Sequence, residues 1–274
     1  MAKFGAGLSL PAILVLSGIS FHAAAQSTAS VPDFSSNGVA WAGGVGRDFA
    51  AVPGSPSPLR QDPAHPFVPN GTGKQPTYRI ADLSNTNLKP WVKDILKKDN
   101  DEVLAGKIAF TPRQSCMPAG VPAFVLYGGG ALHFAQTPKE VSIIFDGDQQ
   151  VRHVYMDVPH SKDVKPSWYG ESVGHYEGDT LVVDTVGLNT KSFVDVYRTP
   201  HTEKLHVTER WRVIDNGNAL ENVLTIDDPE TYNQPWQAAV RYRKVQQPYV
   251  EEVCAEGNFL LFDYGIPTAK QADF

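Results

Sequence analysis

The chain has 274 residues, with 24 Lys and Arg against 30 Asp and Glu and a formal net charge of −6. With 42% hydrophobic and 10% aromatic residues, it is too apolar for a disordered acidic segment. The acidic balance excludes a polybasic protein that binds nucleic acid. The 23 glycines and 21 prolines favour turns and strands over long helices.

The first 25 residues have the pattern of a secretory signal peptide. Lys3 precedes an apolar run over residues 8–21, and three alanines end at Ala25. The alternative, an N-terminal membrane anchor, is disfavoured because the run is too short and wrongly flanked for a spanning helix. We predict cleavage after Ala25 and a periplasmic or secreted protein. No second apolar run approaches about 18 residues, so no membrane span is expected.

Cys116 and Cys254 are the two cysteines of the chain. Export would place them in an oxidising compartment, where two cysteines allow a single pairing. That bridge would close a loop of about 138 residues and contribute up to roughly 5 kcal/mol on the chain-entropy model. The alternative is a pair of reduced structural cysteines, as in a cytosolic protein. We predict the disulfide.

The N-terminal part after the signal peptide predicts an extended arm. Residues 26–80 are rich in Ser, Gly, Pro and Ala and show little periodicity, with Phe34 and Trp41 as anchoring aromatics. The next segment predicts a helix over about residues 90–105. Its apolar side chains recur near helical spacing, and Pro90 suits a first helical turn.

From about residue 108 the pattern changes to short strands separated by turn signals. Hairpin signals occur at 146–148, 177–179 and 215–218, and a fourth hairpin joins strands over 238–245 and 250–254. Successive hairpins indicate an antiparallel meander, and closure into a barrel would remove its exposed edges. About eight strands would match the small barrels that hold one ligand. We expect one β-barrel domain over residues 81–274.

One block of the sequence resembles a known family. Residues 168–185, WYGESVGHYEGDTLVVDT, resemble the SVGxWEGDTLVVDT block of a large family of secreted bacterial proteins of unassigned function, with Tyr176 in place of the usual Trp. Further matching blocks lie at 116–120, 136–138, 159–160, 200–202, 208–211, 225–229, 235–236 and 253–256. The family's hairpin blocks look like those of calycin-type barrels, which carry ligand in the lumen. The resemblance thus implies a mostly β, antiparallel lipocalin-like barrel with an N-terminal arm and one flanking helix, and it implies no reaction.

Two histidines follow prolines at strand boundaries, His160 and His201. Loops from one end of a barrel meet over its lumen, so we expect both imidazoles in one site at the mouth. They could act as acid and base, or bind a metal with Asp157, Asp195 or Glu203. The spacing matches no metal signature, so we predict neither a metal nor another cofactor. The alternative for each is a loop histidine that caps backbone groups.

The strand over 205–211 carries a carboxylate on its apolar face. Alternation places Glu209 with Trp211 toward the lumen, where an unpaired charge is costly. Glu209 is either a general acid or base with a raised pKa, or half of a structural ion pair with Arg152 or an arginine of the last strand. On the strand over 151–158, Arg152 lies on the core face, whereas Tyr155 is expected toward solvent.

These residues predict an exported enzyme that acts by acid–base chemistry, as a lyase, isomerase or hydrolase, on a small apolar or aromatic molecule in the lumen. The expected catalytic residues are Glu209, His160 and His201, and the expected ligand-binding residues are Arg152, Tyr155, Asp184, Trp211 and Asp227. The alternatives are a non-catalytic carrier of a small hydrophobic ligand and an envelope structural or interaction protein. Convergent ionisable groups in the lumen would favour the enzyme. An apolar lumen would favour the carrier, and a lumen filled by side chains would favour the structural role.

Overall fold

The computed structural model describes residues 31–35, 38–43, 48–68, 79–107, 109–126, 130–146 and 150–249, together with Met1 and Val253. The expected signal peptide beyond Met1 lies outside the described residues. So do Cys254 and the expected strand over 250–254, apart from Val253. The cleavage after Ala25 and the pairing of Cys116 with Cys254 therefore stay predictions.

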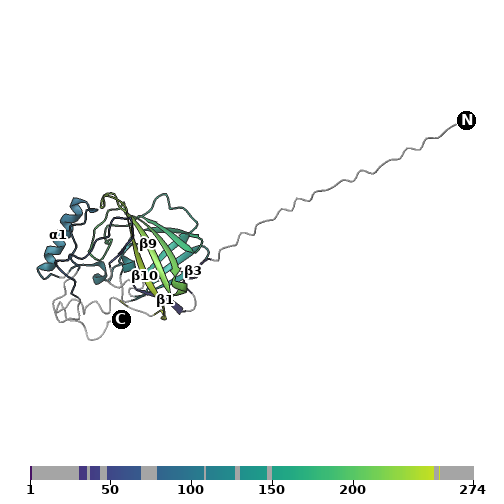
Figure 1. The fold of residues 1–274 in the computed structure, drawn as a ribbon, viewed down its shortest axis with the longest axis horizontal. Helices are drawn as coiled ribbons and strands as arrows, with labels where there is room; N and C mark the ends of the chain where they lie inside the picture. The colour runs from purple at the N-terminus through teal and green to yellow at the C-terminus, as the bar shows by residue number, and fades with distance from the viewer. Residues whose placement is uncertain are drawn as a thin grey trace, which may run out of the picture.

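Nine strands form a closed barrel (Figure 1). In barrel order they are β1 (Val39–Gly43), β3 (Ala131–Gln136), β4 (Glu140–Phe145), β5 (Gln150–Met156), β6 (Glu171–Glu177), β7 (Thr180–Val186), β8 (His206–Ile214), β9 (Ala219–Asp227) and β10 (Trp236–Gln246). Pairing of β1 with the second half of β10 closes the ring, and the short β2 (Ala50–Ala51) pairs with the start of β10. The mostly β, lipocalin-like barrel expected from the sequence is confirmed.

Strand pairing follows the predicted hairpins and departs from them at one place. The hairpins β4–β5, β6–β7 and β8–β9 are all antiparallel, as predicted. Strands β5 and β6 are parallel instead. Parallel neighbours cannot be joined by a tight turn, so residues 157–170 return the chain as a crossover. We call this segment the crossover.

The N-terminal arm is part of the barrel. Its strand β1 bridges β3 and β10, and both expected anchors, Phe34 and Trp41, are buried. The Trp41 indole N–H donates to the Phe34 carbonyl at 2.9 Å, which ties the start of the arm to β1. The barrel therefore needs a strand from residues that precede the expected domain start at residue 81.

Large side chains fill the lumen. The Trp211 ring stacks on Tyr242 at a centroid distance of 6.0 Å and meets the edge of Phe134 at 5.6 Å. Trp211 has no accessible surface, and Tyr242 and Phe134 are also buried. A water-sized void beside these rings would leave them accessible area, so the interior at this level is packed.

Short 3₁₀ helices lie in the connections: η2 (Pro112–Ser115), η3 (Ala123–Leu126) and η4 (Asp215–Gly217). All four residues of η3 are buried. The Val125 carbonyl accepts a hydrogen bond from the Tyr242 hydroxyl at 2.7 Å, and the Phe124 ring lies 5.2 Å from the Arg152 guanidinium. Thus η3 packs directly against inward side chains of the barrel.

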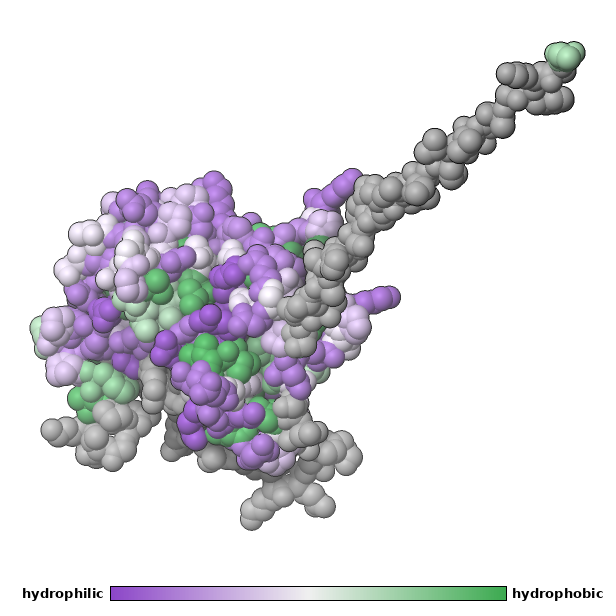
Figure 2. Space-filling model, turned by 45° about the vertical axis from the view of Figure 1, so that its right-hand side comes forward, coloured by the Kyte–Doolittle hydropathy of each residue, from purple (hydrophilic) through white to green (hydrophobic). Residues whose placement is uncertain are grey.

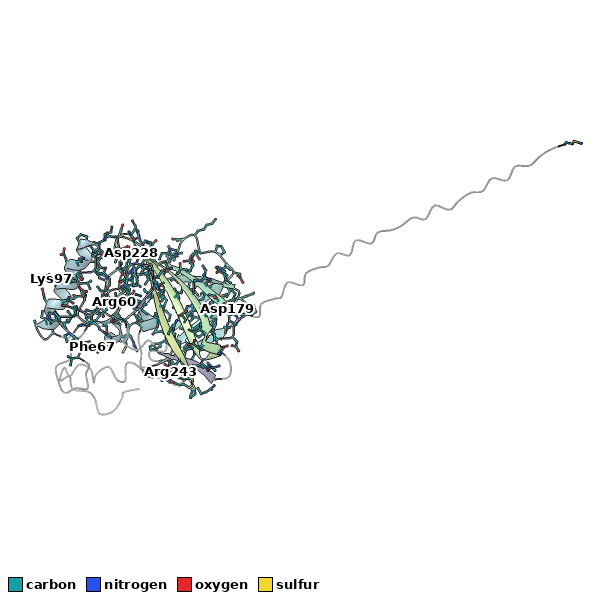
Figure 3. The ribbon with its side chains drawn as sticks, viewed as in Figure 1. Arg60, Phe67, Lys97, Asp179, Asp228 and Arg243 are labelled. Atoms are coloured by element: carbon teal, nitrogen blue, oxygen red, sulfur yellow. The ribbon has the colours of Figure 1, made fainter. Side chains whose placement is uncertain are left out.

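The described residues hold one α-helix, α1 (Pro90–Leu104), at the predicted position. Its Val92 and Leu96 are fully buried, while Lys97 lies on the surface at the edge of the molecule (Figure 3). The Trp91 indole N–H donates to the Glu230 carbonyl at 2.7 Å and fastens the helix to the loop after β9. As Figure 1 shows, α1 flanks the barrel and does not cover its wall.

The outer surface is mixed in polarity. Figure 2 shows hydrophilic side chains over most of the visible face, with smaller hydrophobic patches between them. Asp228 and Arg243 mark opposite ends of the barrel in Figure 3. Within the described part of the chain, no helix has the length and apolar character needed to span a membrane.

Candidate functional site

The lumen contains an ion pair between Arg152 and Glu209, whose side chains are 1% and 0% exposed. Their Nη2 and Oε2 atoms lie 2.5 Å apart. The Arg152 guanidinium also donates to Ser172 Oγ at 3.1 Å and Thr185 Oγ1 at 2.7 Å, and Asn222 donates to Glu209 Oε1 at 3.0 Å. The inward position of Glu209 and its pairing with Arg152 are confirmed.

This pair has the character of a structural element. Each charge is balanced by the other and by neutral polar groups, while Arg152 Nη1, Asn222 Oδ1 and Trp211 Nε1 have no hydrogen-bond partner among the described residues. Glu209 and Trp211 beside it have no accessible surface and Arg152 is 1% exposed, so these side chains are closed off from a ligand in this structure. The structure thus favours the ion-pair interpretation of Glu209 over a role in proton transfer.

A second polar group lies on the outside of the barrel. Glu171, Asp184 and His206 alternate with inward residues of β6, β7 and β8, so their side chains point outward. His160 reaches them from the crossover. Its Nδ1 lies 3.1 Å from Glu171 Oε1, and its Nε2 lies 3.6 Å from Asp184 Oδ2. Asp184 Oδ1 in turn accepts a hydrogen bond from His206 Nε2. We call these four residues the outer chain.

The outer chain has a defined charge state at its carboxylates. Ser161 donates to Glu171 from its backbone N–H at 2.6 Å and its hydroxyl at 2.5 Å, and these bonds lower the pKa of Glu171. The hydrogen bond with His206 lowers the pKa of Asp184, and the same bond raises the pKa of the His206 imidazole. Both carboxyl groups therefore stay ionised, and the His206 imidazole holds its proton to higher pH than an isolated histidine.

A cleft of about 460 Å³ lies between the crossover and the outer face of β5. Tyr155, exposed as predicted, lines it together with Val164, Tyr169 and Glu171. Glu171 belongs to both the cleft and the outer chain. The crossover also approaches the end of β7 closely, since a Cβ added to Gly187 would lie 2.2 Å from Val164 Cγ1.

The remaining predicted histidine lies elsewhere. His201, in the loop between β7 and β8, is buried, and burial lowers its pKa. Its Nδ1 must donate to the Thr202 carbonyl, 2.9 Å away, so Nε2 accepts the proton of the Ser192 hydroxyl at 3.0 Å. A Cβ on Gly120 would lie 2.6 Å from Ser192 Oγ, so this pair is also covered by backbone. His160 and His201 have no described partner in common.

The structure thus divides the predicted site residues into groups. Arg152, Glu209 and Trp211 lie together in the lumen. His160, Tyr155 and Asp184 lie on the outside, and Asp227 is the register partner of His206 there. Sequence reasoning missed His206 and Glu171, although strand alternation already placed His206 on the face opposite Glu209.

No three His, Cys, Asp or Glu side chains among the described residues are arranged to hold a metal ion. Comparisons of the chain with protein-family models, with curated proteins and with solved structures found no match. The resemblance of residues 168–185 to a secreted bacterial family stays a prediction.

Proposed function

We propose that the protein is an exported enzyme that binds a small apolar or aromatic molecule on the outside of its barrel and transfers a proton through His206. The observation that carries this proposal is the outer chain of alternating carboxylates and imidazoles, in which hydrogen bonds join Glu171 to His160 and Asp184 to His206, and an electrostatic contact of 3.6 Å joins His160 to Asp184. It begins at Glu171, in the wall of the cleft, and ends at His206, whose side chain is 43% exposed. A positioned imidazole is the side chain best suited to accept and return protons near neutral pH.

Each member of the outer chain has a distinct role in this proposal. Asp184 accepts a hydrogen bond from the His206 Nε2–H group, which fixes the orientation of the ring. This bond leaves Nδ1 of His206 for proton exchange with a bound molecule. His160 and Glu171 support Asp184 from the other side and act as positioning residues. Tyr155 and Tyr169 supply aromatic surface in the cleft at the Glu171 end of the outer chain, and a ligand bound there is linked to His206 through His160 and Asp184.

The proposal is tested with 5-nitrobenzisoxazole, a small aromatic probe that opens to a coloured phenolate when a base removes its ring-carbon proton. The full chain is expected to open the probe faster than an equal concentration of free imidazole. His206→Gln should lower that rate by about tenfold or more, because general-base catalysis by a positioned group contributes roughly 10²–10⁴-fold.

His175→Gln is the matched control. His175 is also an outward histidine paired with a carboxylate, Glu177, at 3.1 Å, and it lies outside the outer chain. This variant should keep the wild-type rate. Equal loss in both variants, or none in His206→Gln, would contradict the proposal. Saturable binding of the probe with no acceleration would favour the alternative, a non-catalytic carrier.

Export and the Cys116–Cys254 disulfide form part of the same proposal. They are supported by the signal-peptide pattern before Ala25 and by the pair of cysteines in the mature chain. Mass spectrometry of the protein expressed with its leader should give an N-terminus at Gln26, and thiol titration of the unfolded, unreduced protein should find no free thiol. An uncleaved leader or two free thiols would contradict these points.

A further inference from the structure

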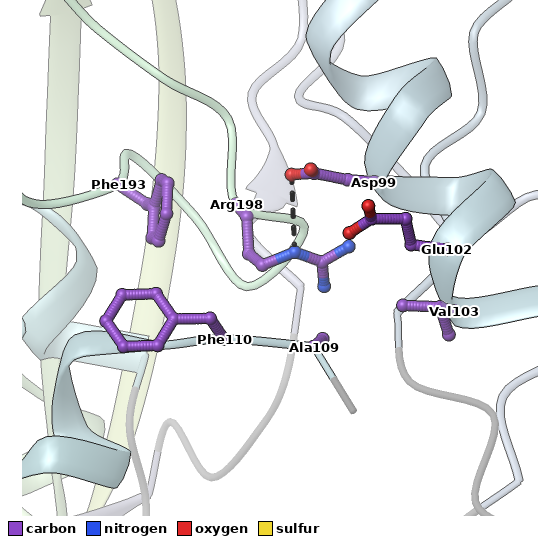
Figure 4. A pocket seen from close by; sticks show the side chains of 7 residues that line it. All are labelled: Asp99, Glu102, Val103, Ala109, Phe110, Phe193 and Arg198. Atoms are coloured by element: carbon purple, nitrogen blue, oxygen red, sulfur yellow. Dashed lines mark ion pairs between the residues drawn. The ribbon is translucent and has the colours of Figure 1, made fainter. Parts of the chain in front are cut away.

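A separate pocket lies between α1 and the loop that joins β7 to β8 (Figure 4). Its volume is about 180 Å³. The lining residues come from α1, from the segment after it and from the β7–β8 loop; they are Asp99, Glu102, Val103, Ala109, Phe110, Phe193 and Arg198. None of them belongs to the lumen or to the outer chain.

Arg198 is the unusual member of this pocket. Its side chain is 4% exposed, and its Nε lies 3.5 Å from Asp99 Oδ2, a long ion pair. The Nη1 and Nη2 atoms are buried and have no hydrogen-bond partner among the residues that the structure describes. Burying a guanidinium with four unused N–H donors is costly unless something accepts from them.

The backbone holds Arg198 in this position. Its φ is 66°, in the left-handed region that side chains rarely adopt. The turn is fixed by Asp195, whose carboxylate accepts the backbone N–H of Tyr197 at 2.9 Å and the hydroxyl of Thr199 at 2.7 Å. The unpartnered nitrogens therefore result from a built turn and not from a loose side chain.

We propose that this pocket binds a small organic monocarboxylate, with the carboxylate on Nη1 and Nη2 of Arg198 and an apolar body against the non-polar side chains that line the pocket. Two parallel N–H donors match the geometry of a carboxylate. In Figure 4 the guanidinium of Arg198 points toward α1, and the phenyl rings of Phe110 and Phe193 lie on the side of the pocket away from that helix. The site is independent of the outer chain and adds a second ligand to the molecule.

Size and charge limit the ligand further. A pocket of about 180 Å³ is smaller than the 300–1,000 Å³ typical of sites for drug-sized ligands, which leaves room for one ring or a short chain. Asp99 offsets part of the Arg198 charge, and Lys107 lies 3.2 Å from Glu102 and offsets that carboxylate. A single negative charge therefore suits the pocket better than a multiply charged anion such as a phosphate.

The test uses benzoate as the probe, with benzamide as its neutral isostere and inorganic phosphate as a bare anion. In NMR titrations of the full chain, benzoate should bind with a Kd about tenfold or more below that of benzamide or phosphate. Arg198→Gln should abolish the difference between benzoate and benzamide. Arg210→Gln, which changes an exposed arginine paired with Glu177, should leave the benzoate Kd unchanged.

A variant at Phe110 covers the case in which Arg198→Gln fails to fold. Phe110 is 57% exposed, so Phe110→Ala is expected to fold, and it should weaken benzoate binding while leaving the weak binding of acetate unchanged. Absence of saturable benzoate binding to the wild-type chain would overturn the proposal. So would equal affinity for benzoate and benzamide, or phosphate binding as tight as benzoate binding.

Discussion

Glu209 and Arg152 illustrate what a charged residue inside a barrel requires of its neighbours. Each is paired with the other, and Ser172, Thr185 and Asn222 satisfy further donors and acceptors. Alternation on β5 and β8 was enough to predict both inward positions, but it left the partner of Glu209 open between Arg152 and an arginine of the last strand. Ser172 and Thr185 could not be predicted as partners of Arg152, because they come from β6 and β7, whose register with β5 is set by the crossover.

Replacing one member of this pair should destabilise the fold strongly. Glu209→Gln leaves the Arg152 guanidinium buried without a counter-charge, so the free energy of unfolding should fall by about 3–5 kcal/mol in a urea melt. The control is Glu177→Gln, in the exposed pair with Arg210, which should change stability by about 0–1 kcal/mol. Similar values for the two variants would mean that the lumen pair is not isolated from solvent.

The buried carboxyl group of Asp195 is a single residue that makes the stability of the fold depend on pH. Burial raises its pKa from 3.8 to about 6, against the lowering effect of its bonds to Thr199 and Tyr197. Between these two values the folded chain holds a proton that the unfolded chain has released. The Asp195 contribution to stability is therefore greatest at low pH and is lost as pH rises from about 4 to about 6, by at most about 3 kcal/mol.

Asp195→Asn should remove this contribution. Urea melts of both proteins between pH 4 and pH 7 should show that the difference in stability between wild type and variant shrinks or changes sign as pH rises. A difference that is constant over this range would show that Asp195 has the same pKa in the folded and unfolded chains.

At the scale of the element, the crossover is the feature that local sequence signals could not predict. The hairpins were predictable because each turn signal joins strands that are neighbours in sequence. The parallel pair β5–β6 has no such signal, since its 14-residue connection begins and ends at opposite ends of the pair. The outer chain depends on this connection, because the crossover brings His160 to Asp184.

A substitution at Gly187 tests how tightly the crossover packs against the end of β7. Gly187→Ala requires a left-handed φ of 69° and a Cβ close to Val164, whereas Gly178→Ala requires a similar φ of 62° with no atom within 4 Å. Gly178→Ala should therefore show only the backbone effect of about 1–2 kcal/mol, and Gly187→Ala should lose about 1–3 kcal/mol more. Chemical denaturation measures both, and adding Val164→Ala should restore much of the excess. Equal losses would indicate a loosely held crossover.

At the scale of the whole molecule, both proposed sites lie outside the lumen of the barrel. The lumen is packed with aromatic side chains and a closed ion pair, and the sequence could not reveal this, because alternation shows which residues face inward but not whether they fill the space. Closure by β1 was also hidden, since a proline- and glycine-rich arm shows no strand periodicity. The outer chain lies where the crossover meets the barrel wall, and the Arg198 pocket lies between α1 and the loop that joins β7 to β8.

The pH dependence of probe opening tests the central claim, proton transfer by His206 held by Asp184, most directly. The rate should rise with pH and reach half its maximum at the pKa of His206, above the ordinary value of 6.5, because the base must first lose its proton. In Asp184→Asn the hydrogen bond that raises this pKa is weakened, so the midpoint should move to lower pH and the plateau should fall. An unchanged midpoint in Asp184→Asn, or a rate independent of pH between 5 and about 9, would contradict the account.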